Sequence, residues 1–316
     1  MCTAINTQGF FGRNLDWEHD FGEEAVILPR NCPLSFRHTK KLDCHYAIMG
    51  IAKTVHSYPL FFDAMNEKGV AVAGLNFVGN AVYNDFSPTK NNVASFEFIP
   101  YLLTRAQSVD EVRALLKDVN VVSTPFSHEM PPSDLHFIIS DEKESITVES
   151  VKEGLKVYSN PVGVLTNNPE FPCQMTHLTY YMNVTNKSAQ NGFSKSLDLK
   201  TVSRGMGAMG LPGDPSSPSR FVMASFVKEN SPLDSLSQFF HLLTHTEQVL
   251  GATEVREGEY EMTEYTSAYS RKEKALFYTT YQNRRITCID TKKYDLDSHT
   301  LLSFPLRRDE DICYEN

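Results

Sequence analysis

The stretch that decides the fold is MCTAINTQGFFGRNLD, residues 1–16. Removal of the initiator methionine would leave Cys2 with both a thiol and a free α-amine, and cysteine is small enough for methionine aminopeptidase to expose it. The ordinary pKa is about 7.7–8.0 for an α-amine and about 8.5 for a thiol, so each group is near the protonation state it needs at neutral pH. Cys2 is therefore a candidate nucleophile that carries its own general base, although a cysteine here can equally be a small buried residue.

Turn residues divide the first part of the chain into short apolar stretches, a pattern typical of β-hairpins. Residues 2–11 predict a hairpin with its turn at 6–9, so the first strand starts at Cys2. A second hairpin is predicted around the turn residues 66–69, and its second strand runs into the sequence Gly-Leu-Asn-Phe. Asn76 is therefore expected at the end of a strand.

Helical periodicity is clearest at residues 108–116, where Ser108 is a suitable N-cap and Glu111 completes a capping box. Further helices are expected at 96–106, 219–229 and 233–248, and further strands at 135–139, 145–149, 154–158, 275–280 and 285–289. Strands that alternate with pairs of helices suit two antiparallel sheets stacked face to face with helices outside each. We therefore predict an α+β fold, a four-layer αββα sandwich, in a single domain of residues 2–316 after removal of Met1.

Composition narrows the class of protein and its partners. The 316 residues carry a net charge of −9, which argues against a nucleic-acid partner because phosphate binding needs clustered Lys and Arg. The start of the chain lacks the basic and apolar regions of a secretory signal, and no apolar run approaches the length of a membrane span. The six cysteines are scattered, without a CxxC pair or metal-ligand spacing. We expect a cytoplasmic protein with no membrane partner and no metal.

An enzyme with an N-terminal cysteine needs a group that holds the α-amine, a positive charge near the sulfur, and donors for an oxyanion. The segment after the first hairpin offers the first two. Asp16 would orient the amine, and Arg13 would favour the thiolate. The alternative is that both are ordinary surface residues at the end of a strand.

Four groups of residues, in order along the chain, resemble the choloylglycine hydrolase family. Members of this family are N-terminal nucleophile hydrolases and include bile salt hydrolases and penicillin V acylases. The groups are MCTA with FGRNLD (1–4 and 11–16), NEKG with GLNF (66–69 and 74–77), VLTNNP (164–169), and PGD with SSPSRF (212–214 and 216–221). The resemblance extends from residue 2 to about residue 285. It implies the αββα fold and amide hydrolysis without a metal or an organic cofactor.

The resemblance also implies roles for residues near the start of the chain. Cys2 would be the nucleophile, with its own α-amine as the general base. Asp16 matches the carboxylate that orients this amine. Arg13 and Arg220 match the arginines that lie beside the sulfur.

Two asparagines complete the implied catalytic set. Asn167 matches the residue of the oxyanion hole and Asn76 matches a second site residue, while Asn168 is an alternative to Asn167 that the sequence alone does not separate. Asn76 and Arg13 also resemble the bile salt hydrolase branch, since penicillin V acylases carry a tyrosine at the former position. The implied substrate is therefore a conjugated bile acid, and a penicillin V acylase is the alternative.

Other residues match positions that determine specificity in the family. Leu15 and Phe62 fall where bile salt hydrolases line their steroid pocket, and Phe126 lies in a Pro-rich loop that could cover it; the alternative for all three is core packing. Ser203 and Arg204 resemble a loop pattern that accompanies a preference for taurine conjugates, where Arg204 could pair with the sulfonate or simply be solvated. The same segment resembles the assembly loop of the family, which implies a homotetramer.

Two further classes of function remain open at this point. A non-catalytic protein that binds amphipathic ligands would keep the fold, although it predicts a damaged catalytic set and the set here is complete. A cysteine-based redox enzyme would use a resolving cysteine, and none lies near Cys2 in the sequence. For the hydrolase, retention of Met1 would block the α-amine in an amide and prevent the chemistry.

Overall fold

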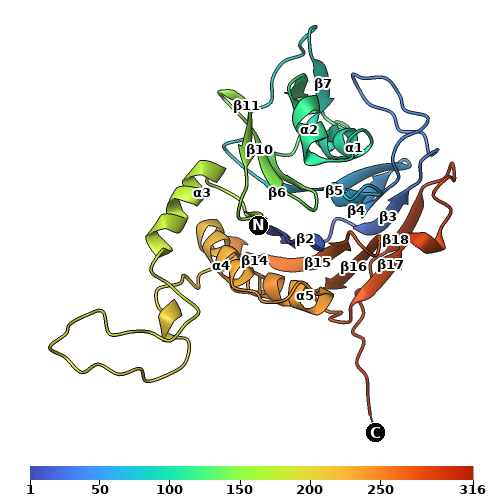
Figure 1. The fold of residues 1–316 in the computed structure, drawn as a ribbon. Coiled ribbons are helices and arrows are strands. Elements are labelled where there is room, and N and C mark those ends of the chain that lie inside the picture. The colour runs from blue at the N-terminus through green and yellow to red at the C-terminus, as the bar shows by residue number, and fades with distance from the viewer. Residues whose placement is uncertain (316) are drawn as a thin grey trace.

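Two stacked antiparallel sheets form the centre of the molecule, which is a computed structural model that describes residues 1–315 (Figure 1). The predicted domain of residues 2–316 therefore ends one residue outside the described range. The six-stranded sheet has the order β12 (Val164–Leu165), β1 (Cys2–Asn6), β2 (Phe10–Trp17), β15 (Met262–Ser270), β16 (Ala275–Thr280) and β17 (Thr287–Asp290). The start of the chain thus lies inside this sheet, between β12 and β2.

The eight-stranded sheet contains the second predicted hairpin. Its order is β11 (Gly154–Ser159), β10 (Ser145–Val151), β9 (Leu135–Ser140), β6 (Ala71–Asn76), β5 (Tyr58–Asn66), β4 (Ile48–Val55), β3 (Glu24–Leu28) and β18 (Leu302–Pro305). Asn76 is the last residue of β6, as predicted. Two small pairs of strands lie outside these sheets: β7 (Asn91–Ala94) with β8 (Val119–Val122), and β13 (Glu254–Arg256) with β14 (Glu259–Tyr260).

Helices cover both outer faces of the two sheets. On the eight-stranded sheet lie α1 (Phe98–Leu103) and α2 (Val109–Leu116), and on the six-stranded sheet lie α4 (Ser217–Glu229) and α5 (Leu236–Thr244) (Figure 1). The predicted N-cap of α2 is present, because the Ser108 hydroxyl accepts from the Glu111 backbone N–H at 3.2 Å. This is the predicted four-layer αββα arrangement.

One helix, α3 (Phe171–Leu178), is absent from the sequence-based prediction. It packs against α4 and buries only Phe171 and Gln174, so its apolar periodicity is weak. The predicted helix at 233–248 is also shorter than expected. It starts only after Ser235, whose hydroxyl accepts from the Gln238 backbone N–H at 3.3 Å.

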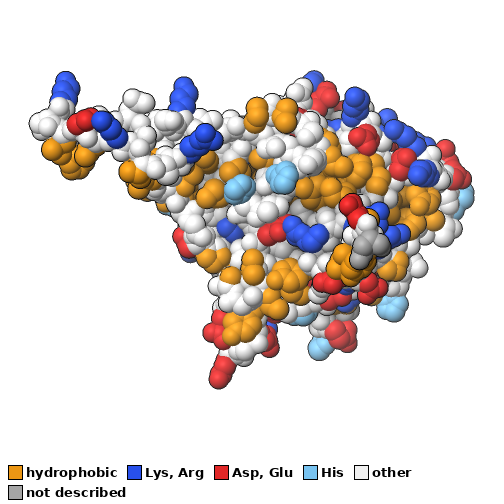
Figure 2. Space-filling view, turned by 90° about the horizontal axis from the view of Figure 1, so that it is seen from below, with side chains coloured by type: hydrophobic (Ala, Val, Ile, Leu, Met, Phe, Trp, Pro, Cys, Tyr) orange, Lys and Arg blue, Asp and Glu red, His pale blue; other side chains and the backbone are white. Residues whose placement is uncertain are grey.

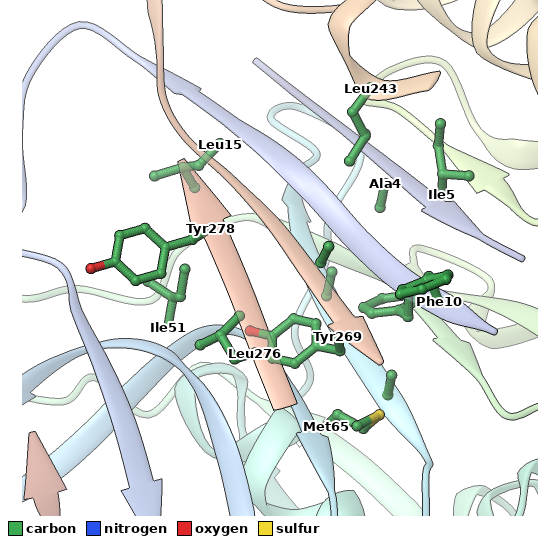
Figure 3. Packing of buried hydrophobic residues seen from close by; sticks show 14 of the residues in the cluster. Ala4, Ile5, Phe10, Leu15, Ile51, Met65, Leu243, Tyr269, Leu276 and Tyr278 are labelled. Carbon is green, nitrogen blue, oxygen red and sulfur yellow. The ribbon is translucent and has the colours of Figure 1, made fainter. Parts of the chain in front are cut away.

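The main hydrophobic core lies between the two sheets. Ile51 and Met65 of the eight-stranded sheet belong to the same buried cluster as Tyr269 and Leu276 of the six-stranded sheet (Figure 3). Burial of each such side chain contributes about 1.5–3 kcal/mol to folding. A second cluster fills the space between the eight-stranded sheet and the α1 and α2 helices. The strand that begins at Cys2 therefore stands on a rigid, packed base.

The register of the first hairpin determines which residues come close to the start of the chain. Cys2 lies opposite Leu15, and Ala4 lies opposite Arg13. At Gly12 the strands β2 and β15 lie so close together that a Cβ atom would be 1.9 Å from the Ser267 carbonyl oxygen. Only glycine fits there, so the FGRNLD motif packs tightly into the centre of the sheet.

Candidate active site

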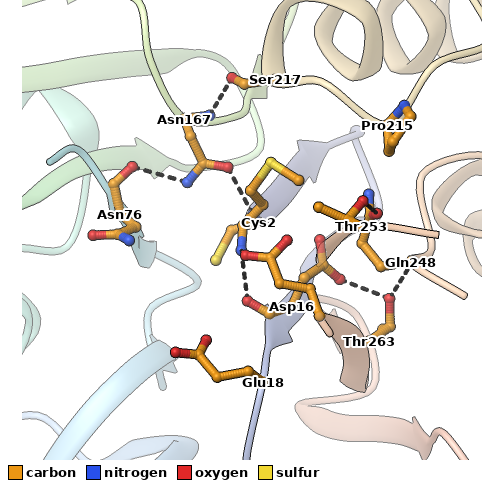
Figure 4. Close-up of polar contacts among 12 residues, drawn as sticks. Cys2, Asp16, Glu18, Asn76, Asn167, Pro215, Ser217, Gln248, Thr253 and Thr263 are labelled. Atoms are coloured by element: carbon orange, nitrogen blue, oxygen red, sulfur yellow. Dashed lines mark hydrogen bonds and ion pairs between the residues drawn. The ribbon is translucent and has the colours of Figure 1, made fainter. Parts of the chain in front are cut away.

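Cys2 is the first residue of β1 and is only 3% exposed. Its backbone N–H donates to Asn167 Oδ1 at 2.7 Å (Figure 4). Met1 continues the strand for one more residue: its carbonyl accepts from the Asp16 N–H at 2.9 Å, and its ammonium donates to the Asp16 carbonyl at 2.7 Å. The nitrogen that Met1 removal would convert into an α-amine is therefore already positioned by the fold.

Asn167 connects several parts of the site. Its Oδ1 accepts from the Cys2 N–H and from Arg220 Nη2 at 2.8 Å, and its Nδ2 donates to the Asn76 carbonyl at 2.8 Å. Its backbone N–H donates to the Ser217 hydroxyl at 2.8 Å. These contacts leave one orientation for the side-chain amide, with one Nδ2 hydrogen still available to an acceptor.

The structure also separates the two neighbouring asparagines. Asn167 is 6% exposed and contacts the Cys2 nitrogen, whereas Asn168 is more exposed and its side chain donates to the Val78 carbonyl at 2.7 Å. Only Asn167 therefore contacts Cys2, and of the two it is the candidate for an oxyanion hole.

Arg220 extends from α4 toward the backbone of the first strand and is 3% exposed. Its Nη1 donates to the Cys2 carbonyl at 2.5 Å and to the Thr3 hydroxyl at 2.6 Å. Burial lowers the pKa of this guanidinium, and the charges of Asp16, Cys2 and Glu261 oppose that effect. The arrangement holds a buried positive charge beside the backbone of Cys2.

The two carboxylate oxygens of Asp16 differ in their hydrogen bonding. Oδ1 accepts from the Thr263 hydroxyl at 2.6 Å, while Oδ2 is buried and has no hydrogen-bond partner among residues 1–315. Burial raises the pKa of Asp16 above its ordinary value of 3.8, and the charges of the Met1 ammonium and Arg220 oppose this. The free oxygen is a possible acceptor for an α-amine at position 2.

Arg13 is fully buried between the two sheets. Its Nη1 donates to the Gly74 carbonyl at 2.5 Å and to the Phe62 carbonyl at 3.3 Å, at the point where the pairing of β5 with β6 ends. Its Nη2 has no hydrogen-bond partner in the described part of the chain. Because the hairpin register pairs Arg13 with Ala4, a second buried cation lies near the start of β1.

The residues predicted to line or cover the substrate pocket lie in different parts of the structure. Leu15 is buried opposite Cys2, and Phe62 is partly buried with its ring 5.8 Å from that of Phe21. Phe126 instead packs against other aromatic rings, at 5.2 Å from Phe96 and 5.7 Å from Tyr58.

The structure does not bring Ser203 and Arg204 to Cys2 within one chain. Both are exposed on the segment 185–207, which projects from the body in Figure 1 and is closed at its base by the Thr185 N–H bond to the Gly207 carbonyl at 2.9 Å. A direct contact between Arg204 and a substrate in the same chain therefore has no support from this geometry.

Several supporting residues were not predicted from the sequence. Thr263 holds Asp16, Ser217 holds the Asn167 backbone, and the Gln174 side chain donates to the Asn167 carbonyl at 2.5 Å. Ser217 lies in the SSPSRF motif and could have been named from it. Thr263 and Gln174 belong to no recognised motif, because their partners are distant along the chain or lie on the unpredicted helix.

The assembled groups are suited to nucleophilic acyl transfer. A thiol at the chain start, two buried guanidinium groups, a buried carboxylate oxygen and the Asn167 side-chain amide lie on elements that surround the start of β1. Among residues 1–315, no cluster of three or more His, Cys, Asp or Glu side chains could hold a metal ion. Across the same range, no helix has both the length and the apolar character that crossing a membrane requires.

Comparison with known proteins gives a consistent result. Residues 2–304 match the model of a family described as linear amide C–N hydrolases, choloylglycine hydrolase family. A bile salt hydrolase/transferase of Lactiplantibacillus plantarum is 49% identical, over 97% of both chains. The crystal structure of a mutant conjugated bile acid hydrolase from Clostridium perfringens has a TM-score of 0.93 at 33% identity, over 100% of both chains. A penicillin V acylase from Agrobacterium tumefaciens shares the fold, with a TM-score of 0.76 at 20% identity over 98% of this chain and 92% of that one.

Proposed function

Because this chain belongs to the choloylglycine hydrolase family of linear amide C–N hydrolases, we propose that it is a bile salt hydrolase that releases glycine or taurine from conjugated bile acids. The observation that carries the proposal is the position of the Cys2 nitrogen, 2.7 Å from Asn167 Oδ1 and beside Arg220. Such a site needs only Met1 removal to hold a nucleophile and its base on one residue.

In the proposed acylation step, the α-amine of Cys2 takes the thiol proton and the thiolate attacks the amide carbonyl carbon. The free Nδ2 hydrogen of Asn167 stabilises the negative charge that develops on the carbonyl oxygen. The amine then passes its proton to the leaving nitrogen, and the C–N bond breaks. Asp16 orients the amine through its free Oδ2.

In the proposed deacylation step, water attacks the thioester that links the bile acid to Cys2. The same α-amine removes a proton from this water and returns it to the sulfur as the C–S bond breaks. Arg13 and Arg220 stabilise the departing thiolate, since both are buried cations whose pKa values respond to the charge of Cys2. Asn76 acts through its carbonyl, which fixes the Asn167 amide.

The bile acid is favoured over penicillin V as the substrate because the similarity to bile salt hydrolases extends over 97% of both chains at 49% identity. The likeness to a penicillin V acylase is at 20% identity and concerns the fold alone. We place the steroid beside Leu15 and Phe62, and we propose that Phe126 covers it from the aromatic cluster that it forms with Phe96 and Tyr58. Release of glycine and taurine from glycocholate and taurocholate, with penicillin V in parallel, tests the choice; turnover of penicillin V alone would contradict it.

Asp16 is expected to determine the acid side of the pH profile. Because burial raises its pKa above 3.8, acidification should protonate it, and lower kcat/KM, at a higher pH than for an ordinary aspartate. Asp16→Asn should lower kcat/KM at neutral pH by about a hundredfold, since the amine loses its orientation. The variant should also lack this ionisation in its profile of kcat/KM against pH. An unchanged acid limb in Asp16→Asn would contradict the assignment.

A homotetramer assembled through the projecting segment is also proposed. Large apolar side chains on and next to this segment are highly exposed, among them Met182 (78%), Phe193 (84%), Val202 (89%) and Met209 (71%). Figure 2 shows hydrophobic side chains gathered on the protrusion. Exposed apolar groups that gather in this way support a protein interface. Arg204, on the same segment, would then act in the assembly or at a neighbouring chain's pocket.

The free state of all six cysteines supports a location in the cytoplasm.

Light scattering is expected to give four times the chain mass for the unmodified protein. Replacement of Phe193 by Asp should produce smaller species with an unchanged circular dichroism spectrum, because it introduces a charge into the apolar contact. Leu233→Asp, at a residue that is 63% exposed outside the segment, serves as the control and should leave the mass unchanged. A wild-type monomer would disprove the proposed assembly.

A further inference from the structure

An ammonium group occupies a built site next to Cys2 in the unprocessed chain. The Met1 ammonium donates to Glu261 Oε1 at 2.5 Å and to the Asp16 carbonyl at 2.7 Å. Glu261 immediately precedes β15, and the Asp16 carbonyl belongs to β2, so the two acceptors are fixed by neighbouring strands of one sheet. Removal of Met1 takes the ammonium away but leaves both acceptors in place.

Among residues 1–315, the Glu261 side chain has no hydrogen-bond partner other than the Met1 ammonium, and its backbone N–H donates to the Thr253 carbonyl at 3.0 Å. Its side chain is only 9% exposed, and Oε2 is buried without a hydrogen-bond partner among residues 1–315. The charges that act around it are those of Arg220, Asp16 and the ammonium itself. A carboxylate that is buried without a partner is costly, so a bound cation is needed to stabilise it in the processed chain.

The site lies beside the α-amine that protonates the leaving nitrogen in the proposed mechanism. The Met1 nitrogen is separated from the Cys2 nitrogen by the bonds of one residue, so the two atoms lie within about 4 Å of each other. The α-amine nitrogen of the processed chain is tetrahedral: one direction is its covalent bond to Cα, and another points along its hydrogen bond to Asn167 Oδ1. Of the two other directions around this nitrogen, loss of Met1 opens the one that the peptide bond occupied. The leaving nitrogen receives its proton from this α-amine, so the path vacated by Met1 is open to it.

We infer that Glu261 and the Asp16 carbonyl form a subsite for the ammonium of the primary amine that the enzyme releases, or that it accepts in the reverse direction. The ligand class is a small amino acid or aminosulfonate, such as glycine or taurine. This inference rests on the proposed function and names the groups that recognise the amine half of the substrate. Glu261 is here a binding residue, and the α-amine of Cys2 keeps the role of base.

The reverse transfer balances without a further reactant. The arriving ammonium loses one proton to water, and its lone pair attacks the carbonyl carbon of the thioester on Cys2. The new C–N bond forms, the C–S bond breaks, and the second proton passes through the α-amine to the sulfur. Anchoring the ammonium beside the thioester raises the local concentration of the amine relative to water.

The test measures how the acyl-enzyme divides between water and an added amine. Processed wild-type protein is given glycocholate with increasing taurine, and taurocholate and cholate are quantified by mass spectrometry. Glu261→Gln should lower the ratio of transfer to hydrolysis about tenfold, which is typical of losing one charge-assisted hydrogen bond. The matched control is Glu264→Gln, which removes a carboxylate of the same sheet that is paired with Arg308 and should leave the ratio unchanged.

A neutral nucleophile distinguishes recognition of charge from a structural defect. Hydroxylamine is largely uncharged at neutral pH, so its transfer ratio should be the same in wild type and Glu261→Gln. An equal loss with hydroxylamine and taurine, an equal loss in Glu264→Gln, or no taurine transfer by an active wild type would overturn the inference and leave the proposed function intact. Absence of cholate release from wild type would instead reject the proposed function, and the inference with it.

Discussion

Replacement of Cys2 by alanine is expected to lower the rate of bile salt deconjugation by about four to six orders of magnitude, because loss of a covalent nucleophile removes the acyl-enzyme route. Cys2 is the first residue of β1, is buried, and accepts a hydrogen bond from Arg220 through its carbonyl. The measurement is the initial rate of cholate release from glycocholate by protein whose N-terminus has been verified by mass spectrometry.

Two variants make this result specific. Cys288→Ala removes an exposed thiol of β17 and should leave the rate unchanged. Cys2→Ser keeps the α-amine and the side-chain volume but has a much less acidic hydroxyl, so it should retain little activity. Substantial deconjugation by Cys2→Ala would mean that the nucleophile lies elsewhere and would remove the basis of the mechanism.

Asn167→Ala is expected to reduce kcat by about a hundred- to a thousandfold, the cost of removing one side-chain donor from an oxyanion hole. The effect should fall on kcat more than on KM, because the bond to the carbonyl oxygen strengthens only as negative charge develops. Steady-state kinetics with taurocholate provide the measurement. Circular dichroism controls for folding, since Asn167 also contacts Asn76 and Ser217.

The neighbouring asparagine supplies the matched control. Asn168 differs in that its side chain donates to the Val78 carbonyl and is not in contact with Cys2. Asn168→Ala should therefore change kcat by less than about threefold, which is typical of a polar group outside the reacting centre. If Asn168→Ala loses as much activity as Asn167→Ala, the assignment of the oxyanion hole to Asn167 is wrong.

The parts of the site that could be predicted from the sequence are those set by local signals. The hairpin that starts at Cys2 follows from turn residues at 6–9 and places Arg13 and Asp16 on the adjacent strand. Asn76 at the end of β6 follows from a turn in the same way. Recognition of the family then added the distant Arg220, which no local pattern would connect with Cys2.

The residues that were missed depend on contacts across the fold. Thr263 and Glu261 lie far from Asp16 and Met1 in the sequence, and only the pairing of β15 with β2 brings them together. No spacing or motif marks them in advance. The helix α3 was missed for a different reason. It buries few side chains, and it begins near a proline, which in a sequence indicates a turn.

The residues predicted to determine specificity also differ in whether a local sequence signal sets their position. Leu15 could be placed because the hairpin register sets it opposite Cys2. Phe126 and Arg204 lie on loops whose course no periodicity encodes, and the structure puts one in an aromatic cluster and the other on the projecting segment. Positions on long loops depend on tertiary or subunit contacts, which a single sequence leaves undetermined.

The most direct test of the account is mass spectrometry of the processed protein after rapid acid quenching of its reaction with glycocholate. The mechanism predicts a cholyl group attached as a thioester to the N-terminal peptide that begins at Cys2, and its loss on treatment with hydroxylamine. The same experiment on protein that retains Met1 should give no adduct, because the α-amine is then an amide. Deconjugation by protein that retains Met1, or a cholyl group on any other residue, would contradict the central claim that a free N-terminal Cys2 is the nucleophile.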